Sequence, residues 1–374
     1  MEKAFIFGTA VEGDNFTDRT QESKRLKMNF ESGVNTILIS PRRMGKTSLV
    51  KKVINEVADK NIKIIYMDIY DCRDEYDFYN RFASAILRGT ATKVEQIFDS
   101  AKEFLERIAP KISISPDQTA EYSVSLGINP KNTSPEEVLS LPERIAIKKG
   151  LHIIVCIDEF QQIGEFSDTL NIQKKMRGVW QHQQHTSYCL FGSKKHLMAN
   201  LFQSRRMPFY QFGDTIILEK ISTDEWIPFI QKRFASGEKQ ISAALAEKIC
   251  SKVENYSAYV QQLAWNVYIN TQNEATEETV EESMEELLRQ NEALFMAQID
   301  GLTTYQMNFL RALCSGIDSG FASKDIMETW NIGTKSNITR IMKVLTEKEL
   351  IEKEWKTVRI TDPVFRLWFS IHCM

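Results

Sequence analysis

The sequence Ser40-Pro41-Arg42-Arg43-Met44-Gly45-Lys46-Thr47-Ser48 decides the fold of this chain. It follows a short apolar run at 36–39 and precedes a segment with helical periodicity at 49–54. A buried strand, a tight turn and a helix in this order are typical of a loop that binds phosphate groups. In such a loop, backbone N–H groups and the positive end of the helix dipole face the anion. The sequence therefore predicts a phosphate loop at 40–48.

Side chains of this loop have the chemistry that a bound nucleoside triphosphate requires. Lys46 can bridge the β- and γ-phosphates, and the hydroxyl of Thr47 can ligate Mg²⁺. Ser40 stands where the motif usually has glycine, so the fixed φ of Pro41 can set the loop's shape instead. In a lysine-rich chain, Gly-Lys-Thr can also be a plain helix start. The predicted nucleotide-binding residues of the loop are Ser40, Pro41, Arg42, Arg43, Met44, Gly45, Lys46, Thr47 and Ser48.

Composition limits the classes of protein to which the chain can belong. Its 374 residues exceed one ordinary core, which indicates two or three domains. The net charge of −3 gives no global basic signature for nucleic acid or an anionic membrane. Six cysteines occur without a CxxC pair, which favours reduced thiols in a cytoplasmic protein. No segment approaches the ~18 apolar residues of a membrane span, so no membrane partner is expected.

Strand and helix patterns alternate downstream of the phosphate loop. The segment 62–68 reads as a strand and 76–87 as an amphipathic helix, which predicts a parallel sheet with helices on its faces. Between 111 and 128, apolar and polar residues alternate on either side of a turn. This pattern predicts a hairpin inserted into the α/β unit, followed by a helix from 135 to 147.

A pair of acids follows a continuously apolar strand pattern. The run 151–157 is expected to be a central strand, and Asp158 and Glu159 stand at its carboxyl end. Ligands of parallel α/β sheets bind at that end. Asp158 is predicted to hold the water shell of Mg²⁺, and Glu159 to orient and deprotonate an attacking water molecule. Taken alone, such a pair is equally often a helix N-cap.

Four further residues are candidates for contact with a nucleotide. Arg19 precedes the phosphate loop and can reach the base or a phosphate, or form a surface ion pair. Ser193 follows a buried strand pattern, where it can touch the γ-phosphate or simply form a turn. Arg205 and Arg206 precede the last strand of the predicted sheet. They can stabilise charge on the transferred phosphate, in the same chain or in a neighbouring copy, or pair with surface acids.

The remainder of the chain has another pattern. Helical periodicity continues without a strand from 223 to 300, with a cap signature at Thr223, and predicts an all-helical domain where P-loop ATPases have a lid. Three helical segments and an alternating hairpin follow within 301–374, which is the order of a winged helix.

The third helix of that winged helix is predicted to expose Lys335, Asn337, Arg340 and Lys343, a face suited to phosphate and base contacts. From Phe321 onward, nine Lys or Arg side chains stand against seven Asp or Glu, a net charge of +2 that is weak for a DNA-binding module. Winged helices also bind proteins, so DNA and a protein both stay open as partners.

In these motifs, the chain resembles the archaeal-type AAA+-like P-loop ATPases, a group allied to the signal-transduction ATPases with numerous domains (STAND). The resemblance implies that ATP and Mg²⁺ bind an α/β parallel-sheet core at 1–222, followed by a helical lid at 223–300 and a winged helix at 301–374. The family's Walker A motif corresponds to the phosphate loop, and its Walker B motif to the acid pair. The similarity spans nearly the whole chain and rests on Phe16-Thr17-Asp18-Arg19, the loop 40–48, Ile157-Asp158-Glu159-Phe160-Gln161, Phe191-Gly192-Ser193, Tyr259-Val260-Gln261-Gln262-Leu263 and Asp362-Pro363-Val364-Phe365-Arg366-Leu367-Trp368-Phe369.

Two departures from the family pattern bear on the rate of hydrolysis. Residues 255–258 lack the usual His-Pro pair ahead of Tyr-Val-Gln, and Asp18-Arg19-Thr20 replaces Gly-Arg-Glu. Both departures favour slow hydrolysis. We therefore expect a Mg²⁺-dependent ATPase that acts as a nucleotide-dependent switch and not as a motor. Two alternatives stay open: a DNA-binding regulator in which ATP is a structural ligand, and a nucleotide-dependent protein scaffold that self-associates.

Overall fold

The computed structural model describes residues 4–11, 13, 16–90, 112–116, 122–126 and 134–374. The chain forms two compact units. We call Ala10–Lys220 the sheet unit, and Ile221–Met374 together with Met1–Thr9 the helical unit. Because the N-terminal segment belongs to the helical unit, the chain passes between the two units twice.

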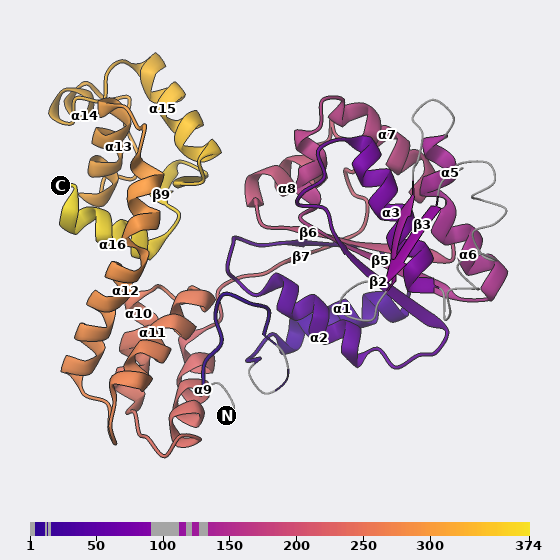
Figure 1. Cartoon of the computed structure of the whole chain (residues 1–374). Helices are drawn as coiled ribbons and strands as arrows, with labels where there is room; N and C mark the ends of the chain where they lie inside the picture. The colour runs from indigo at the N-terminus through magenta and orange to yellow at the C-terminus, as the bar shows by residue number, and fades with distance from the viewer. Residues whose placement is uncertain (1–3, 12, 14–15, 91–111, 117–121, 127–133) are drawn as a thin grey trace. The chain divides into compact units, whose positions relative to one another are not determined.

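The sheet unit is built on a five-stranded parallel sheet (Figure 1). The strand order is β2-β5-β6-β1-β7, so the first strand of the chain lies inside the sheet. Strands β1 and β6 are buried along their whole lengths, and β5 is buried after its first residue, which explains why their sequences are largely apolar. The predicted parallel α/β fold is confirmed. The strands are β1 Thr36–Ile39, β2 Ile62–Asp68, β5 His152–Asp158, β6 Thr186–Gly192 and β7 Asp214–Ile217.

The register of the sheet brings the ends of distant segments to one edge. Asp68 at the end of β2 lies opposite Asp158 at the end of β5. Ile39 at the end of β1 lies opposite Gly192 at the end of β6. The segments that follow these strands, including the loop that begins at Ser40, therefore leave the sheet at the same carboxyl edge.

Helices cover both faces of the sheet, with α1 and α2 below it and α7 and α8 above it in Figure 1. The core on one face contains the stacked rings of Trp180 and Tyr188, whose centroids are 4.0 Å apart, with Phe82 beside them. The core on the other face packs Leu26 of α1 and apolar residues of α2 against Phe191. The helices and the 3₁₀ segment are α1 Thr20–Glu31, α2 Lys46–Glu56, α3 Glu75–Thr90, α5 Pro135–Leu139, α6 Leu141–Lys149, η2 Phe160–Glu165, α7 Thr169–Trp180 and α8 Lys195–Gln203.

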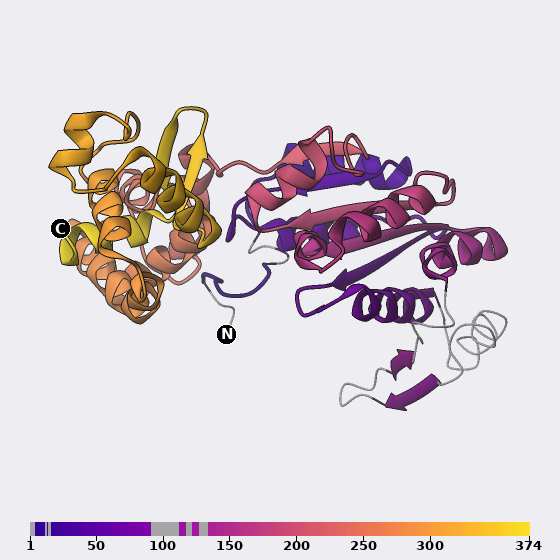
Figure 2. The same cartoon turned by 90° about the horizontal axis from the view of Figure 1, so that it is seen from above.

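Two features lie between α3 and β5. The predicted hairpin corresponds to β3 Ile112–Pro116 and β4 Tyr122–Leu126, which pair antiparallel outside the main sheet (Figure 2). The other residues of the segment 111–128 lie outside the described part of the chain. The single helix predicted over 135–147 is wrong, because α5 and α6 meet at Ser140. Pro142 lies in the first turn of α6, where a missing N–H is tolerated and a new helix readily begins.

The helical unit contains four helices, then three helices, a hairpin and a last helix (Figure 1). The predicted winged helix is confirmed, and α16 follows its hairpin as a helix that the sequence did not predict. Asp362 is the N-cap of α16, and its Oδ1 accepts hydrogen bonds from the N–H groups of Val364 (2.9 Å) and Phe365 (3.0 Å). The elements are α9 Thr223–Ala235, α10 Ala243–Lys252, α11 Ser257–Asn270, α12 Glu277–Ile299, α13 Thr304–Cys314, α14 Lys324–Thr329, α15 Lys335–Glu347, β8 Ile351–Glu354, β9 Thr357–Ile360 and α16 Pro363–His372.

Contacts inside the helical unit join α11 and α12 to the winged helix. The hydroxyl of Tyr259 donates to Asp362, and the rings of Phe295 and Phe365 meet edge to face with centroids 5.6 Å apart. The predicted cap at Thr223 is wrong: Ser222 is the N-cap of α9, and Thr223 instead exchanges a hydrogen bond with the amide of Asn255. Among the described residues, no helix is both long and apolar enough to cross a membrane.

Candidate nucleotide-binding site

The loop from Ser40 to Gly45 turns the chain from β1 into α2. Gly45 is the N-cap of α2 with φ 83°, in the left-handed region where glycine has no steric penalty, and Arg43 has φ 64°. No side chain caps α2, so the first N–H groups of this helix are not bound by a capping side chain. A turn of this kind, ahead of an 11-residue helix, directs several amide hydrogens and the positive end of the helix dipole to one point.

Lys46 folds back over this loop. Lys46 is only 6% exposed. Its Nζ donates hydrogen bonds to the backbone oxygens of Pro41 (3.1 Å) and Ser40 (3.4 Å). Ser40 is fully buried, and its hydroxyl donates to the same Pro41 oxygen (2.9 Å). The ammonium group is therefore held at the loop by carbonyl oxygens, which a phosphate oxygen can replace as the partner.

Arg19 and Ser48 connect the loop to the segment that precedes α1. Arg19 is 3% exposed, and its guanidinium donates to the backbone oxygen of Met44 (3.2 Å) and to Glu22 (3.1 Å). Arg19 thus forms an ion pair with Glu22, as one alternative expected, but its guanidinium is buried against the loop and not exposed at the surface. The hydroxyl of Ser48 accepts a hydrogen bond from the N–H of Val11 (2.8 Å).

Asp158 joins the loop to the central strands. Its Oδ2 accepts hydrogen bonds from the hydroxyls of Thr47 (2.9 Å) and Tyr66 (2.8 Å), and its Oδ1 accepts one from the N–H of Glu159 (2.8 Å). Asp158 is 4% exposed, and this burial raises the pKa of its carboxyl above the ordinary value, although the three hydrogen bonds oppose the rise. Burial also raises the pKa of the Tyr66 phenol, and the nearby Asp158 charge adds to this shift.

The pair formed by Thr47 and Asp158 fits Mg²⁺ chemically. A hydroxyl oxygen and a carboxylate oxygen 2.9 Å apart are both hard oxygen ligands. Within the described part of the chain, no cluster of three or more His, Cys, Asp or Glu side chains could hold a metal by itself. Mg²⁺ usually takes one or two protein ligands and completes its shell with phosphates and water, so a site this small suits a metal that arrives with a nucleotide.

Glu159 has a strained backbone, and its carboxylate accepts two hydrogen bonds from side chains. Its φ is 54°, a left-handed value that is uncommon for a residue with a side chain and that often occurs at functional sites. Its Oε2 accepts hydrogen bonds from the hydroxyl of Ser193 (2.9 Å) and from the amide of Gln161. The structure thus brings Glu159 and Ser193 together, beside Asp158 and the loop.

Arg205 and Arg206 do not join this group. Both are exposed in the segment after α8, and neither makes a hydrogen bond or ion pair with any residue that the structure describes. Sequence reasoning also missed two members of the site, Tyr66 and Gln161. A phenol inside a strand that is otherwise largely apolar was the one available signal for Tyr66.

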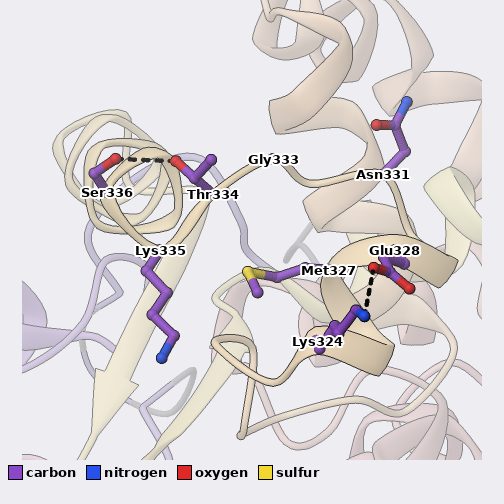
Figure 3. A pocket seen from close by; sticks show the side chains of 8 residues that line it. All are labelled: Lys324, Met327, Glu328, Asn331, Gly333, Thr334, Lys335 and Ser336. Carbon is purple, nitrogen blue, oxygen red and sulfur yellow. Dashed lines mark hydrogen bonds and ion pairs between the residues drawn. The ribbon is translucent and has the colours of Figure 1, made fainter.

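The face predicted on the winged helix is only partly available for contacts. Lys335, Arg340 and Lys343 are exposed on α15 as predicted, and Lys343 lies 3.8 Å from the carboxylate of Glu347. The amide of Asn337 donates to the backbone oxygen of Ile332 (3.2 Å), so this side chain is half-buried and does not extend from the face as predicted. An open pocket of about 750 Å³ lies at the start of α15 (Figure 3). It is lined by Lys324, Met327, Glu328, Asn331, Gly333, Thr334, Lys335 and Ser336.

The fold and this arrangement define a P-loop ATPase with a winged helix, and the chain belongs to an archaeal ATPase family. Residues 16–249, more than half of the chain, match the family described as an ATPase domain predominantly from Archaea. Residues 293–371 match a family described as a probable winged helix domain. No curated protein matches the chain in sequence.

Three solved archaeal structures are similar to this chain. The Walker-type ATPase PABY2304 of Pyrococcus abyssi is similar over 98% of this chain and 100% of its own length, with a TM-score of 0.71 and 17% identity. The ORC2 protein of Aeropyrum pernix, solved as ADPNP–ADP complexes, is similar over 98% and 96%, with a TM-score of 0.57 and 14% identity. The ORC1 protein of Aeropyrum pernix, in complex with DNA, is similar over 96% and 94%, with a TM-score of 0.50 and 12% identity.

Proposed function

We propose that this protein is a Mg²⁺-dependent ATPase that acts as a nucleotide-dependent switch. The observation that supports it best is the 2.9 Å hydrogen bond between Thr47, at the start of α2, and Asp158, at the end of β5. This contact joins a phosphate loop to a buried carboxylate at the carboxyl edge of a parallel sheet, where such folds bind nucleotides. Family membership supports nucleotide binding by the core.

Each residue of the site has a part in the proposed reaction. The amides of the loop and the ammonium of Lys46 bind the triphosphate, while Thr47 and Asp158 hold Mg²⁺ as Walker A and Walker B residues. The metal, when bound, neutralises charge on the β- and γ-phosphates. Glu159 orients a water molecule and accepts its proton, and the hydroxyl of Ser193, which now donates to Glu159, lies beside the position proposed for the γ-phosphate.

The proposed chain organisation follows the sequence: an ATPase core at 1–222, a helical lid at 223–300 and a winged helix at 301–374. Arg205 and Arg206 are proposed as charge stabilisers, supplied within the chain or by a second copy. ATP-dependent self-association on a sizing column would support the second route. We also propose a cytoplasmic location, which is supported by six free cysteines.

Three variants test the catalytic assignment. Lys46→Ala should lose both ATP binding and hydrolysis, because it removes the cation of the loop. Glu159→Gln should bind ATP like the parent and hydrolyse it about 10²- to 10⁴-fold more slowly, the usual contribution of a general base. Lys60→Ala, which removes an exposed lysine after α2, is the charge-matched control and should behave like the parent. A Glu159→Gln protein with the parent's turnover would refute the role given to Glu159.

A second candidate function is DNA binding by the winged helix with ATP as a structural ligand. Trp355, at the turn of the β8–β9 hairpin, is 97% exposed, with Glu354 before it and Lys356 after it, both also exposed. An exposed aromatic ring next to a lysine suits contact with bases and phosphates. Duplex binding measured over a series of salt concentrations tests this candidate: a steep loss of affinity with salt supports it, and no binding at low salt excludes it.

A further inference from the structure

Two donors converge on one oxygen of Glu159. The hydroxyl of Ser193 donates to Oε2 at 2.9 Å, and the side-chain amide of Gln161 donates to the same atom. Oε1 of Glu159 accepts no hydrogen bond from any residue that the structure describes. One carboxylate oxygen is thus held by two bonds, while the other has no partner from the described chain.

Gln161 is itself tightly fixed. It lies in the first turn of η2 and is 2% exposed. Its Oε1 lies where a side chain at position 192 would begin, because a Cβ built on Gly192 would come within 1.7 Å of this oxygen. Only a glycine at 192 leaves room for the amide of Gln161 in this position.

The side-chain amide of Gln161 donates a hydrogen bond to Glu159, while its own oxygen accepts none. Its Oε1 is buried and has no hydrogen-bond partner among the described residues. A buried acceptor without a partner is destabilising, and most buried polar groups avoid this state. Rotating the amide by 180° would turn Oε1 toward the carboxylate of Glu159 and set two acceptors against each other, so the network fixes the orientation with the donor toward Glu159.

We infer that Gln161 is a positioning residue for Glu159. Its amide, together with Ser193, fixes the carboxylate through Oε2 and leaves Oε1 as the oxygen that accepts a proton from the attacking water. This inference rests on the proposed function, since it needs Glu159 to be the general base. Gln161 does not touch the nucleotide in this account, and it acts only through the carboxylate that it holds.

The test is the Gln161→Met variant of the full chain, because Met keeps the length of the side chain and removes the donor. We expect kcat to fall about tenfold or more while the Kd for ATP stays within about twofold, the pattern of an interaction that matters for the chemical step alone. The matched control is Gln162→Met, at the next residue of the same turn. It removes the hydrogen bond from the side-chain amide of Gln162 to the backbone oxygen of Cys72 (3.3 Å). Its kcat should equal that of the parent.

A double variant separates positioning from a general structural role. In a Glu159→Gln background, Gln161→Met should cause no further loss of the residual single-turnover rate, because residues that act through one group are not additive. The inference is overturned if Gln161→Met has the parent's kcat, or if it lowers the rate equally in both backgrounds. Should Gln161→Met fail to fold, Gln161→Asn, whose amide is one methylene too short to reach Glu159, takes its place in the same cycle. Full turnover in Glu159→Gln alone would instead refute the role given to Glu159, and a parent chain without ATP turnover would refute the proposed function.

Discussion

The carboxyl edge of the sheet and the exposed surface of the winged helix differ in how deeply their functional side chains are buried and in how many hydrogen bonds these side chains make. At the edge, Asp158 is 4% exposed and accepts three hydrogen bonds. On the winged helix, Trp355 is 97% exposed, and the guanidinium of Arg340 makes no hydrogen bond or ion pair with any described residue. The groups at the edge depend on one another, whereas the side chains of Trp355 and Arg340 act singly.

This difference predicts two kinds of response to substitution. Removing one member of a buried network leaves its partners unsatisfied, so the effect exceeds the loss of a single bond. Removing an exposed side chain changes stability little, and its contribution to a partner adds independently. The three predictions below test this contrast, from the largest expected effect to the smallest.

Gly192→Ala should have the largest effect. The added Cβ would overlap the amide oxygen of Gln161 at 1.7 Å and crowd the sulfur of Met198 at 3.1 Å. Chemical denaturation should show a loss of about 1–3 kcal/mol, as for other overpacked cores, together with reduced ATP turnover. The matched control is Gly178→Ala in α7, where the added Cβ meets no atom of the described residues within 4 Å. It should gain up to about 1 kcal/mol, since alanine favours a helix over glycine. Equal responses at the two positions would contradict the contrast.

Asp158→Asn should separate stability from function. Asparagine can accept from the Glu159 N–H through its oxygen, and its amide can donate to Thr47 and Tyr66, whose hydroxyls can rotate to accept. Because burial raises the pKa of Asp158, ionising this carboxyl is unfavourable in the folded chain, and the ligand-free variant should be as stable as the parent at pH 7, or more stable by no more than about 1 kcal/mol.

The sign of the pH dependence follows from the same shift. At a pH below the ordinary pKa of a carboxyl group, Asp158 is protonated in both the folded and the unfolded chain. Its titration then has no effect on the free energy of unfolding. As pH rises through that range toward the raised pKa of the folded chain, the parent loses stability relative to Asp158→Asn. Melting curves from pH 4 to pH 8 measure this difference. A parent whose stability rises relative to that of the variant with increasing pH would contradict the raised pKa of Asp158. Equal stabilisation of parent and variant by Mg²⁺ATP would contradict its role as a Mg²⁺ ligand.

Arg340→Ala and Trp355→Ala should have the smallest effects. Each should change the free energy of unfolding by less than about 0.5 kcal/mol, because these exposed side chains hold no part of the fold. If the winged helix binds DNA, Arg340→Ala should also reduce the salt dependence of binding by about one phosphate contact. Lys60→Ala, an equal change of charge in the sheet unit, should leave that dependence unchanged. A loss of stability in either variant like that of Gly192→Ala would remove the distinction between edge and face.

What the sequence could predict was local in the chain. The phosphate loop and the acid pair were visible because each follows a strand within a few residues. The parallel sheet was visible in the alternation of strands and helices. The strand order β2-β5-β6-β1-β7 was not, because it depends on pairing between segments far apart in the sequence.

Tyr66 and Gln161 were missed for physical reasons. Tyr66 lies opposite Cys156 in the register of β2 and β5, and its hydroxyl reaches Asp158 two residues further along. No residue near Tyr66 in the sequence indicates that contact. Gln161 returns to Glu159 because the left-handed backbone of Glu159 leads into a 3₁₀ turn, a local shape that a pattern of residue types does not indicate. For Arg19, the sequence allowed both a nucleotide contact and a surface ion pair; the structure has an ion pair with Glu22, but with the guanidinium buried against the loop.

The central claim is that the loop at 40–48, with Lys46 and the Thr47–Asp158 pair, binds Mg²⁺ATP. The most direct measurement is the thermal unfolding of the full chain in buffer and with Mg²⁺ATP at about 100 times its Kd, compared with Lys46→Ala. The parent should gain about 2.7 kcal/mol of stability from the ligand at that ratio. Lys46→Ala should gain none under the same conditions. A parent chain that Mg²⁺ATP does not stabilise, or a Lys46→Ala chain stabilised equally, would contradict the account.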